Sequence, residues 1–219
     1  MMLYLSKLLK ARKPALKAVA ALLEPGEAAQ RLDADHRLLW SLFADDPAAK
    51  RDFLWRVEGC RYLVLSKRAP MPSPFFDSPQ VRHFAPDLRA GDHLFFSLRV
   101  NATRTRKGVG RVDIVMDALH GIAPRQRAVQ RMDVAQMAAT DWMTRQGTRT
   151  GFACRDLLVE DYSVLTLPRT SRAGQPRFGI LDLTGTLEVT EPATFLTHLG
   201  EGFGRAKAFG CGLMLIRRG

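Results

Sequence analysis

Residues 53–67 read FLWRVEGCRYLVLSK, two short apolar runs on either side of a Glu58-Gly59 pair. Short runs rich in β-branched and aromatic residues, separated by a glycine-containing turn, predict an antiparallel hairpin. Before it, the apolar run Leu3–Leu9 predicts a strand, and the apolar positions within residues 38–43 have helical spacing. A strand, a helix and a hairpin in this order begin a β-α-β-β pattern.

Two further elements complete this pattern, a short helix near Ser78–Val81 and a strand near His83–Pro86. The order β-α-β-β-α-β is that of the ferredoxin-like fold. The segment Asp87–Asp92 is polar and contains a glycine, which predicts a domain boundary. We therefore expect a first domain over residues 1–89 and a second over residues 90–219.

The second half predicts the same order of elements. Its strands are apolar stretches, and its longer helix has apolar residues every three or four positions. The predicted elements are the strand His93–Val100, the helix Pro124–Gln146, the strands Asp156–Thr166 and Ile180–Val189, the helix Thr190–Leu199 and the strand Leu213–Arg217. The fold class is α+β, a tandem of one fold; a single α+β domain with the same elements is the alternative.

The chain is strongly basic for its length. It has 219 residues, with 33 Lys+Arg against 22 Asp+Glu, a net charge of +11 and a pI of about 10.2. This balance is typical of proteins with a polyanionic partner, most often nucleic acid, and the alternative is a soluble protein that is basic without such a partner. Three scattered cysteines argue against a disulfide scaffold and a zinc knuckle, and no apolar run reaches membrane-spanning length. We expect a cytoplasmic protein without metal or cofactor.

His36 is the candidate for acid–base chemistry. Asp33 and Asp35 precede it and are of the type that begins helices, which predicts that His36 lies in a first helical turn. The positive end of the helix dipole would lower the pKa of the imidazole and attract phosphate. A neutral imidazole accepts a proton near pH 7. The alternative is a histidine that serves only packing or solvation.

Arginine-rich segments and a glycine-rich segment predict contacts to a sugar-phosphate chain. Arginine and lysine side chains track phosphates, and glycines let the backbone approach them. The candidates are Arg99, Arg104, Arg106, Lys107, Arg111, Arg169, Arg172, Arg177, Gly202, Gly204, Arg205, Lys207, Gly210 and Gly212. Strand alternation would place Arg104 and Arg106 on one face. The alternatives are a solvated face for the arginines, and a helix end with a tight entry into the last strand for the glycines.

Several motifs, in order along nearly the whole chain, resemble the CasE family, the repeat-processing subunits of type I-E CRISPR Cascade complexes. They are MLYLSK at residues 2–7, DHRLLWSLF at 35–43, RDFLWRVE at 51–58, FSLRVNA at 96–102 and GFGRAKAFGCGL at 202–213. The segment around His36 and the glycine-rich segment are the most specific of these motifs.

This resemblance implies two tandem ferredoxin-like (RRM-like) domains and a metal-independent endoribonuclease. It implies that the protein cuts CRISPR precursor RNA below a repeat hairpin, stays bound to the hairpin and joins other Cascade subunits. It implies that His36 is the catalytic histidine and that basic residues of the second domain hold the stem. No membrane and no small-molecule substrate are expected.

The chain departs from the family pattern at one position. Some relatives carry a tyrosine three residues before the histidine, as a proposed catalytic partner, and here that position is Asp33. Either Asp33 supports the imidazole, or another residue does, or His36 works largely alone. The rival classes are a non-catalytic subunit that binds hairpin RNA and a plain assembly subunit.

Overall fold

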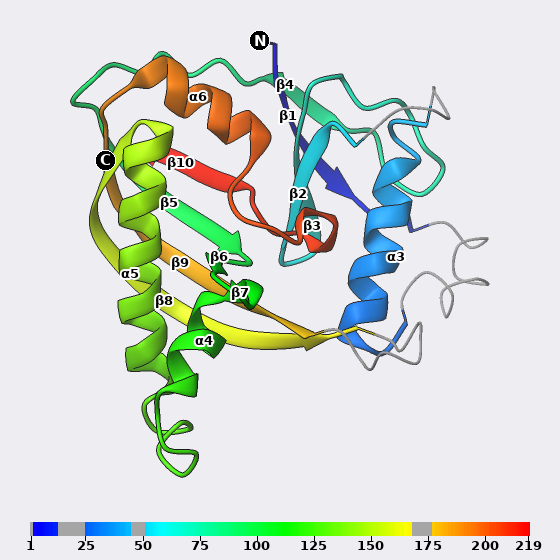
Figure 1. Cartoon of the computed structure of the whole chain (residues 1–219). Coiled ribbons are helices and arrows are strands. Elements are labelled where there is room, and N and C mark those ends of the chain that lie inside the picture. The colour runs from blue at the N-terminus through cyan, green and yellow to red at the C-terminus, as the bar shows by residue number, and fades with distance from the viewer. Residues whose placement is uncertain (1, 13–24, 45–50, 168–176) are drawn as a thin grey trace. The chain divides into compact units, whose positions relative to one another are not determined.

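The structure is a computed structural model that describes residues 2–12, 25–44, 51–167 and 177–219. The chain divides into two compact units (Figure 1). The main part of the first unit is Met1–Pro86, and the short segment Lys207–Gly210 also belongs to it. The second unit begins at Asp87. Each unit is built on its own four-stranded antiparallel sheet, so the α+β class is confirmed.

The first unit contains the predicted hairpin. Its strands are β1 (Tyr4–Leu9), β2 (Phe53–Glu58), β3 (Arg61–Ser66) and β4 (Gln80–His83), in the sheet order β2-β3-β1-β4. The β2–β3 register pairs Glu58 with Arg61 across the turn. Gly59 has a φ of 61°, a left-handed conformation that a residue without a Cβ adopts at little energetic cost.

Helix α3 (Ala28–Trp40) packs its apolar side on one face of this sheet (Figure 1). The core between them contains Leu8, Leu38, Leu39, Leu42, Phe43, Phe53, Trp55, Tyr62, Val64 and Phe76. The helix begins earlier than predicted, after Glu27, which makes no side-chain capping bond. The prediction that Asp33 or Asp35 caps the helix is wrong, because both lie within it.

The predicted helix at Ser78–Val81 is also wrong. This segment is extended and leads into β4, whose residue Gln80 pairs with Lys7 of β1. The backbone of β1 needs hydrogen-bond partners on both edges, and β3 supplies only one of them. Residues 67–79, all of them described, contain no helix, so the β-α-β-β-α-β order is incomplete in the first unit.

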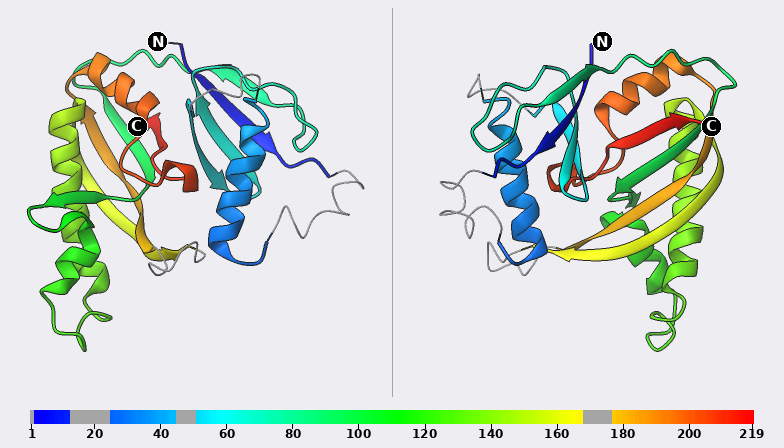
Figure 2. Two further views of the ribbon diagram at one scale, coloured as in Figure 1. Left: turned by 45° about the vertical axis from the view of Figure 1, so that its right-hand side comes forward. Right: turned by 180° about the vertical axis from the view of Figure 1, so that it is seen from behind.

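The second unit has the order β-α-β-β-α-β that its sequence predicts. Its elements are β5 (His93–Val100), α5 (Arg131–Thr150), β8 (Phe152–Thr166), β9 (Arg177–Val189), α6 (Pro192–Glu201) and β10 (Met214–Arg218). The sheet order is β10-β5-β9-β8, and α5 and α6 lie on the same face of it (Figure 2). None of the described helices is long and apolar enough to cross a membrane.

The basic segment after β5 forms a hairpin of β6 (Thr103–Arg106) and β7 (Gly110–Asp113), followed by α4 (Ile114–His120). Asp113 is the cap of α4 and fixes the hairpin to β8 and β9. Its carboxylate accepts hydrogen bonds from the backbone N–H groups of Val115, Met116 and Gly179 at 3.0, 3.0 and 3.1 Å, from Tyr162 Oη at 3.2 Å and from Asn101 Nδ2 at 3.4 Å.

We expect Asp113→Ala to lower the free energy of unfolding by about 3 kcal/mol, because it removes a helix cap and leaves partly buried donors unpaired. Urea denaturation followed by circular dichroism measures this change. Asp141→Ala is the matched control, since among the described residues that exposed carboxylate pairs with Arg145 alone, on the same helix, and contributes about 0.5 kcal/mol or less. Equal losses in the two variants would contradict the anchoring role of Asp113.

Candidate active site

His36 lies in the C-terminal half of α3, with its ring against an aromatic group. The ring centroid is 6.0 Å from that of Phe53 on β2 and 6.3 Å from that of Trp40, one turn further along the helix. Phe53 in turn stacks on Phe43, at 4.8 Å. The predicted position in the first turn is therefore wrong, and the helix dipole cannot act on His36 as expected.

The pKa of His36 is nevertheless lowered from its ordinary value of 6.5. Burial of the ring is the largest cause, and the positive charge of Arg51 is the next. Asp33 acts in the opposite direction, and Arg37 adds a further lowering. The predicted direction is thus confirmed with a different cause, and the imidazole is neutral at neutral pH.

The ring also has a buried nitrogen without a partner among the described residues. In that part of the chain Nε2 of His36 is buried and makes no hydrogen bond. Nearly all buried polar atoms in proteins are paired, and each exception calls for an explanation, such as a catalytic role. The imidazole is half-buried and neutral, and a neutral imidazole can accept a proton near pH 7.

The two acids near His36 have other partners. Asp33 forms an ion pair with Arg37, at 2.6 Å, on the same helix. Asp35 is buried, where Lys10 Nζ lies 3.0 Å from its Oδ1 and Tyr62 Oη donates a hydrogen bond of 2.6 Å. In the described structure neither carboxylate hydrogen-bonds the imidazole. Asp33 acts on His36 only through its charge, and Asp35 stabilises the core.

Arg51 is the site residue that sequence patterns did not reveal. It lies just before β2 and is half-buried, and its charge reaches His36. Burial lowers the pKa of its guanidinium from the ordinary value. One signal could have found Arg51: it precedes Phe53 by two residues. Alternate residues of an extended segment share one face, so Arg51 is expected on the face of Phe53.

The glycine-rich segment is divided between the two units. Lys207–Gly210 belongs to the first unit, where the short 3-10 helix η1 (Lys207–Phe209) contacts α3 and β2. Lys207 is therefore in the same unit as His36. Gly210 has a φ of 74°, and a Cβ on it would lie 3.5 Å from the ring of Trp55.

The other glycines of this segment have structural reasons to be glycine. Gly202, Gly204 and Gly212 all have positive φ. A Cβ on Gly204 would lie 2.4 Å from Val100 Cγ2 and 2.6 Å from the carbonyl oxygen of Asn101. The segment is tied to the end of β5, since Gly212 N–H donates to the Arg99 carbonyl at 2.7 Å. Backbone conformation and close packing therefore account for glycines that the sequence had suggested for RNA contact.

Three of the predicted cations of the second unit bind carboxylates. Arg99 donates two hydrogen bonds to Asp182, at 2.8 and 2.7 Å. Arg104 and Arg106 lie on one face, as predicted, and both bind Asp117 of α4, at 2.8 and 2.7 Å. The two guanidinium groups leave the Asp117 side chain 4% exposed, and they lower the pKa of its carboxyl group. These ion pairs balance charge that the sequence alone had presented as free.

Other predicted cations remain available to a ligand. Lys107, Arg111, Arg177 and Arg205 are exposed, and in the described part of the chain their side chains have no ion-pair or hydrogen-bond partner. Lys107 and Arg111 belong to the β6–β7 hairpin. Arg169 and Arg172 lie outside the described residues.

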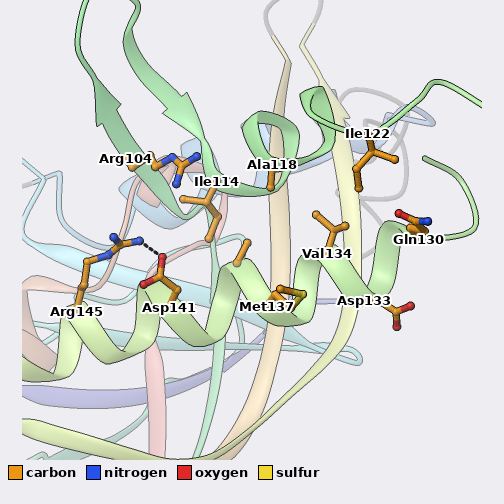
Figure 3. Close-up of a pocket in the computed structure, with 11 residues that line it drawn as sticks. Arg104, Ile114, Ala118, Ile122, Gln130, Asp133, Val134, Met137, Asp141 and Arg145 are labelled. Carbon is orange, nitrogen blue, oxygen red and sulfur yellow. Dashed lines mark hydrogen bonds and ion pairs between the residues drawn. The ribbon is translucent and has the colours of Figure 1, made fainter. Parts of the chain in front are cut away.

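A pocket of about 650 Å³ opens in the second unit between α4, α5 and the β6 strand (Figure 3). Apolar side chains of Ile114, Val134 and Met137 line it, and Arg104 and Arg145 lie beside them. Its lining also includes the carboxylates of Asp133 and Asp141, but no histidine. Among the described residues, no three His, Cys, Asp or Glu side chains gather as the ligands of a metal ion.

Fold and site together define a basic two-unit α+β protein, with a half-buried histidine beside an arginine in the first unit and exposed cations in the second. A family model described as CRISPR associated protein matches residues 3–218. The chain therefore belongs to this CRISPR-associated family, that of CasE, Cse3 and Cas6e, which confirms the predicted resemblance.

Individual relatives agree with this assignment. The CRISPR system Cascade subunit CasE of Escherichia coli (strain K12) is 28% identical over 191 residues, which cover 83% of this chain and 89% of CasE. The structure of Thermus thermophilus Cse3 bound to an RNA representing a pre-cleavage complex matches with a TM-score of 0.67 and 22% identity, over 99% of this chain and all of that chain (100%). Cas6e from E. coli str. K-12 matches with a TM-score of 0.56 and 21% identity, over 98% and 99% of the two chains.

Proposed function

We propose that this protein is a metal-independent endoribonuclease that cuts CRISPR precursor RNA at the base of the repeat hairpin. It then remains bound to the hairpin as a subunit of a cytoplasmic Cascade complex. The observation that carries the proposal is the half-buried His36, neutral and with an unpaired ring nitrogen, beside Arg51. Two relatives support it: one is named CRISPR endoribonuclease Cse3 bound to RNA, and the other is named a Cascade subunit.

The proposed reaction is an internal transesterification. Neutral His36 removes the proton from the ribose 2′-OH on the 5′ side of the scissile phosphate, and the 2′ oxygen attacks phosphorus in line. The bond to the 5′ oxygen of the next nucleotide breaks, and this oxygen takes up a proton from solvent, which leaves a 2′,3′-cyclic phosphate and a 5′-OH. A general base contributes about 10²–10⁴-fold to such a step, and positioning of the bound hairpin contributes much of the rest.

We further propose that both units are ferredoxin-like (RRM-like) domains, with the boundary near residues 89 and 90. The order β10-β5-β9-β8 and the β-α-β-β-α-β sequence of elements support this for the second unit. The order β2-β3-β1-β4 supports it for the first unit, although no second helix is present between β3 and β4.

In this proposal the exposed cations of the second unit hold the RNA stem. A double-stranded stem is bound mostly through its shape and backbone, to which exposed lysine and arginine side chains are suited. Lys107, Arg111, Arg177 and Arg205 are the candidates with available side chains. The ion-paired Arg99, Arg104 and Arg106 are assigned a supporting part, in which they fix the strands that carry the free cations.

A second candidate function is a non-catalytic subunit that binds hairpin RNA. The observation in its favour is Asp33, which occupies the position of a tyrosine in some relatives and pairs with Arg37, so that His36 lacks a hydrogen-bonding partner from that position. The two functions differ in one result, whether the bound hairpin is cut.

The deciding experiment incubates the full chain with hairpin RNA of the neighbouring CRISPR repeat, in EDTA, and analyses both ends of any product. The expected products carry a 2′,3′-cyclic phosphate and a 5′-OH. Tight binding without any cut would favour the non-catalytic subunit, and a cut that disappears in EDTA would overturn the metal-independent mechanism. A chain that binds no RNA at low salt would indicate a plain assembly subunit.

Replacement of Lys107 and Arg111 together by alanine is expected to weaken hairpin binding and to reduce the slope of log K against log salt concentration by about 2, one for each lost phosphate contact. Filter-binding titrations from 50 to 300 mM salt, roughly the range where such contacts are screened, measure the slope. The control is the double variant of Arg125 and Arg149, also exposed. An unchanged slope in the first variant would show that the β6–β7 hairpin does not contact the RNA.

A further inference from the structure

We propose that Arg51 is a second catalytic residue, whose guanidinium binds a non-bridging oxygen of the scissile phosphate and stabilises the charge that develops there. This inference rests on the proposed endoribonuclease function and assigns the cation that the mechanism needs. It is carried by the position of Arg51, by its lack of a partner among the described residues and by the charges around His36.

The backbone places Arg51 on the face of the sheet that carries His36's neighbours. Lys67 N–H donates to the Asp52 carbonyl at 3.2 Å, so the β2–β3 ladder continues one residue beyond the pair of Phe53 and Ser66. In an extended segment, residues two apart point to the same side. Arg51 therefore shares the face of Phe53, whose ring lies 6.0 Å from the His36 ring.

In the described part of the chain Arg51 has no partner, unlike three other arginines of the first unit. Arg68 binds Asp52 at 2.7 Å, Arg56 binds Glu58 at 2.5 Å and Arg37 binds Asp33 at 2.6 Å. The described residues offer Arg51 no ion pair, hydrogen bond or aromatic ring, although its side chain is half-buried. An unpaired, partly desolvated cation is unfavourable unless a ligand supplies the missing anion.

The charges that face His36 fit a site for a phosphodiester. Arg51 and Arg37 are positive, Asp33 is the acid among them and is paired with Arg37, and η1 brings Lys207 to the same helix. Arg51 is the cation in this group whose charge acts on the imidazole and that has no carboxylate partner among the described residues. One group thereby acts twice, because its positive charge adds to the effect of burial in lowering the pKa of His36 and also attracts the phosphate that His36 must reach.

The same contact explains a catalytic gain. In the transition state the two non-bridging oxygens carry more negative charge than in the bound RNA. A fixed donor aimed at them stabilises the transition state more than the ground state, and loss of one such donor lowers rate constants by about 10²–10³-fold. Guanidinium is suited to this because it stays protonated and presents several N–H groups in a plane.

The test compares full-length Arg51→Ala and Arg51→Lys with the unaltered protein and with His36→Ala, in EDTA and under single-turnover conditions. Arg61→Ala is the matched control, because that exposed arginine is on the same hairpin at its opposite end, across from Glu58. Rate constant, hairpin affinity and the pH dependence of the rate are measured for each, and circular dichroism verifies folding.

Arg51→Ala is expected to lower the rate constant by about 100-fold and the affinity by less than about 5-fold, roughly one lost phosphate contact. The acid limb of its pH–rate profile should move to higher pH, because removal of a positive charge raises the pKa of His36. Arg51→Lys should keep the acid limb in place and recover part of the rate. Arg61→Ala should match the unaltered protein in all three.

Two results would overturn the role of Arg51 while leaving the endoribonuclease intact. One is a rate within about threefold of the unaltered protein for Arg51→Ala, when about 100-fold is expected. The other is an affinity that falls as much as the rate with the acid limb unmoved, which would make Arg51 a binding contact. If the unaltered protein binds the hairpin but does not cut it, the proposed function itself fails, and Arg51 loses its catalytic role with it.

Discussion

His36→Ala is expected to bind the repeat hairpin almost as tightly as the unaltered protein and to cut it about 10²–10⁴-fold more slowly. In the proposed function the imidazole is the general base, whereas affinity is assigned to exposed cations in the other unit. Single-turnover cutting and filter binding measure the two quantities separately. His120→Ala, which removes an exposed histidine at the C-terminal end of α4, is the control and should cut normally. Normal cutting by His36→Ala would show that another group is the base.

The pH dependence of cutting follows from the same group. Since His36 must be neutral to accept a proton and its pKa is lowered from 6.5, the rate should rise with pH through a midpoint below 6.5 and then level off. His36→Ala should lose this rise. A midpoint above 6.5 in the unaltered protein would mean that burial and Arg51 do not control the group that titrates.

A single 2′-deoxy substitution on the 5′ side of the scissile phosphate should abolish cutting altogether and leave binding unchanged. The substitution removes the attacking oxygen but not the phosphates that the cations contact. The control carries the 2′-deoxy sugar on the 3′ side of the same phosphate and should be cut at the normal rate. A cut in the first RNA would indicate attack by water and would exclude the cyclic phosphate intermediate.

Much of the fold followed from local patterns. The hairpin around Gly59 and the strands of the second unit were predicted because alternation and turn chemistry are local properties of the chain. The start of α3 was predicted wrongly, because the helix begins after Glu27 without a capping side chain. Asp35 instead lies in the core, where it binds Lys10 and Tyr62. Those partners are distant in sequence.

The candidate site was predictable only in part. The motif around His36 identified the imidazole, but its lowered pKa comes from burial and from Arg51 in a different element. The arginines of the second unit looked free because their carboxylates are not neighbours in sequence. Asp182 reaches Arg99 across the β5–β9 pair, and Asp117 reaches Arg104 from the next helix. Such pairings depend on tertiary structure.

The assignment of Lys207–Gly210 to the first unit has a consequence for biosynthesis. A ribosome makes residues 1–86 early, yet the segment that packs on α3 and β2 emerges only after the whole second sheet except β10. The nascent first unit thus lacks a piece of its packing, including the backbone beside Trp55, through most of translation. The packing around α3 and β2 is completed late, so a chain truncated before this segment would not acquire it.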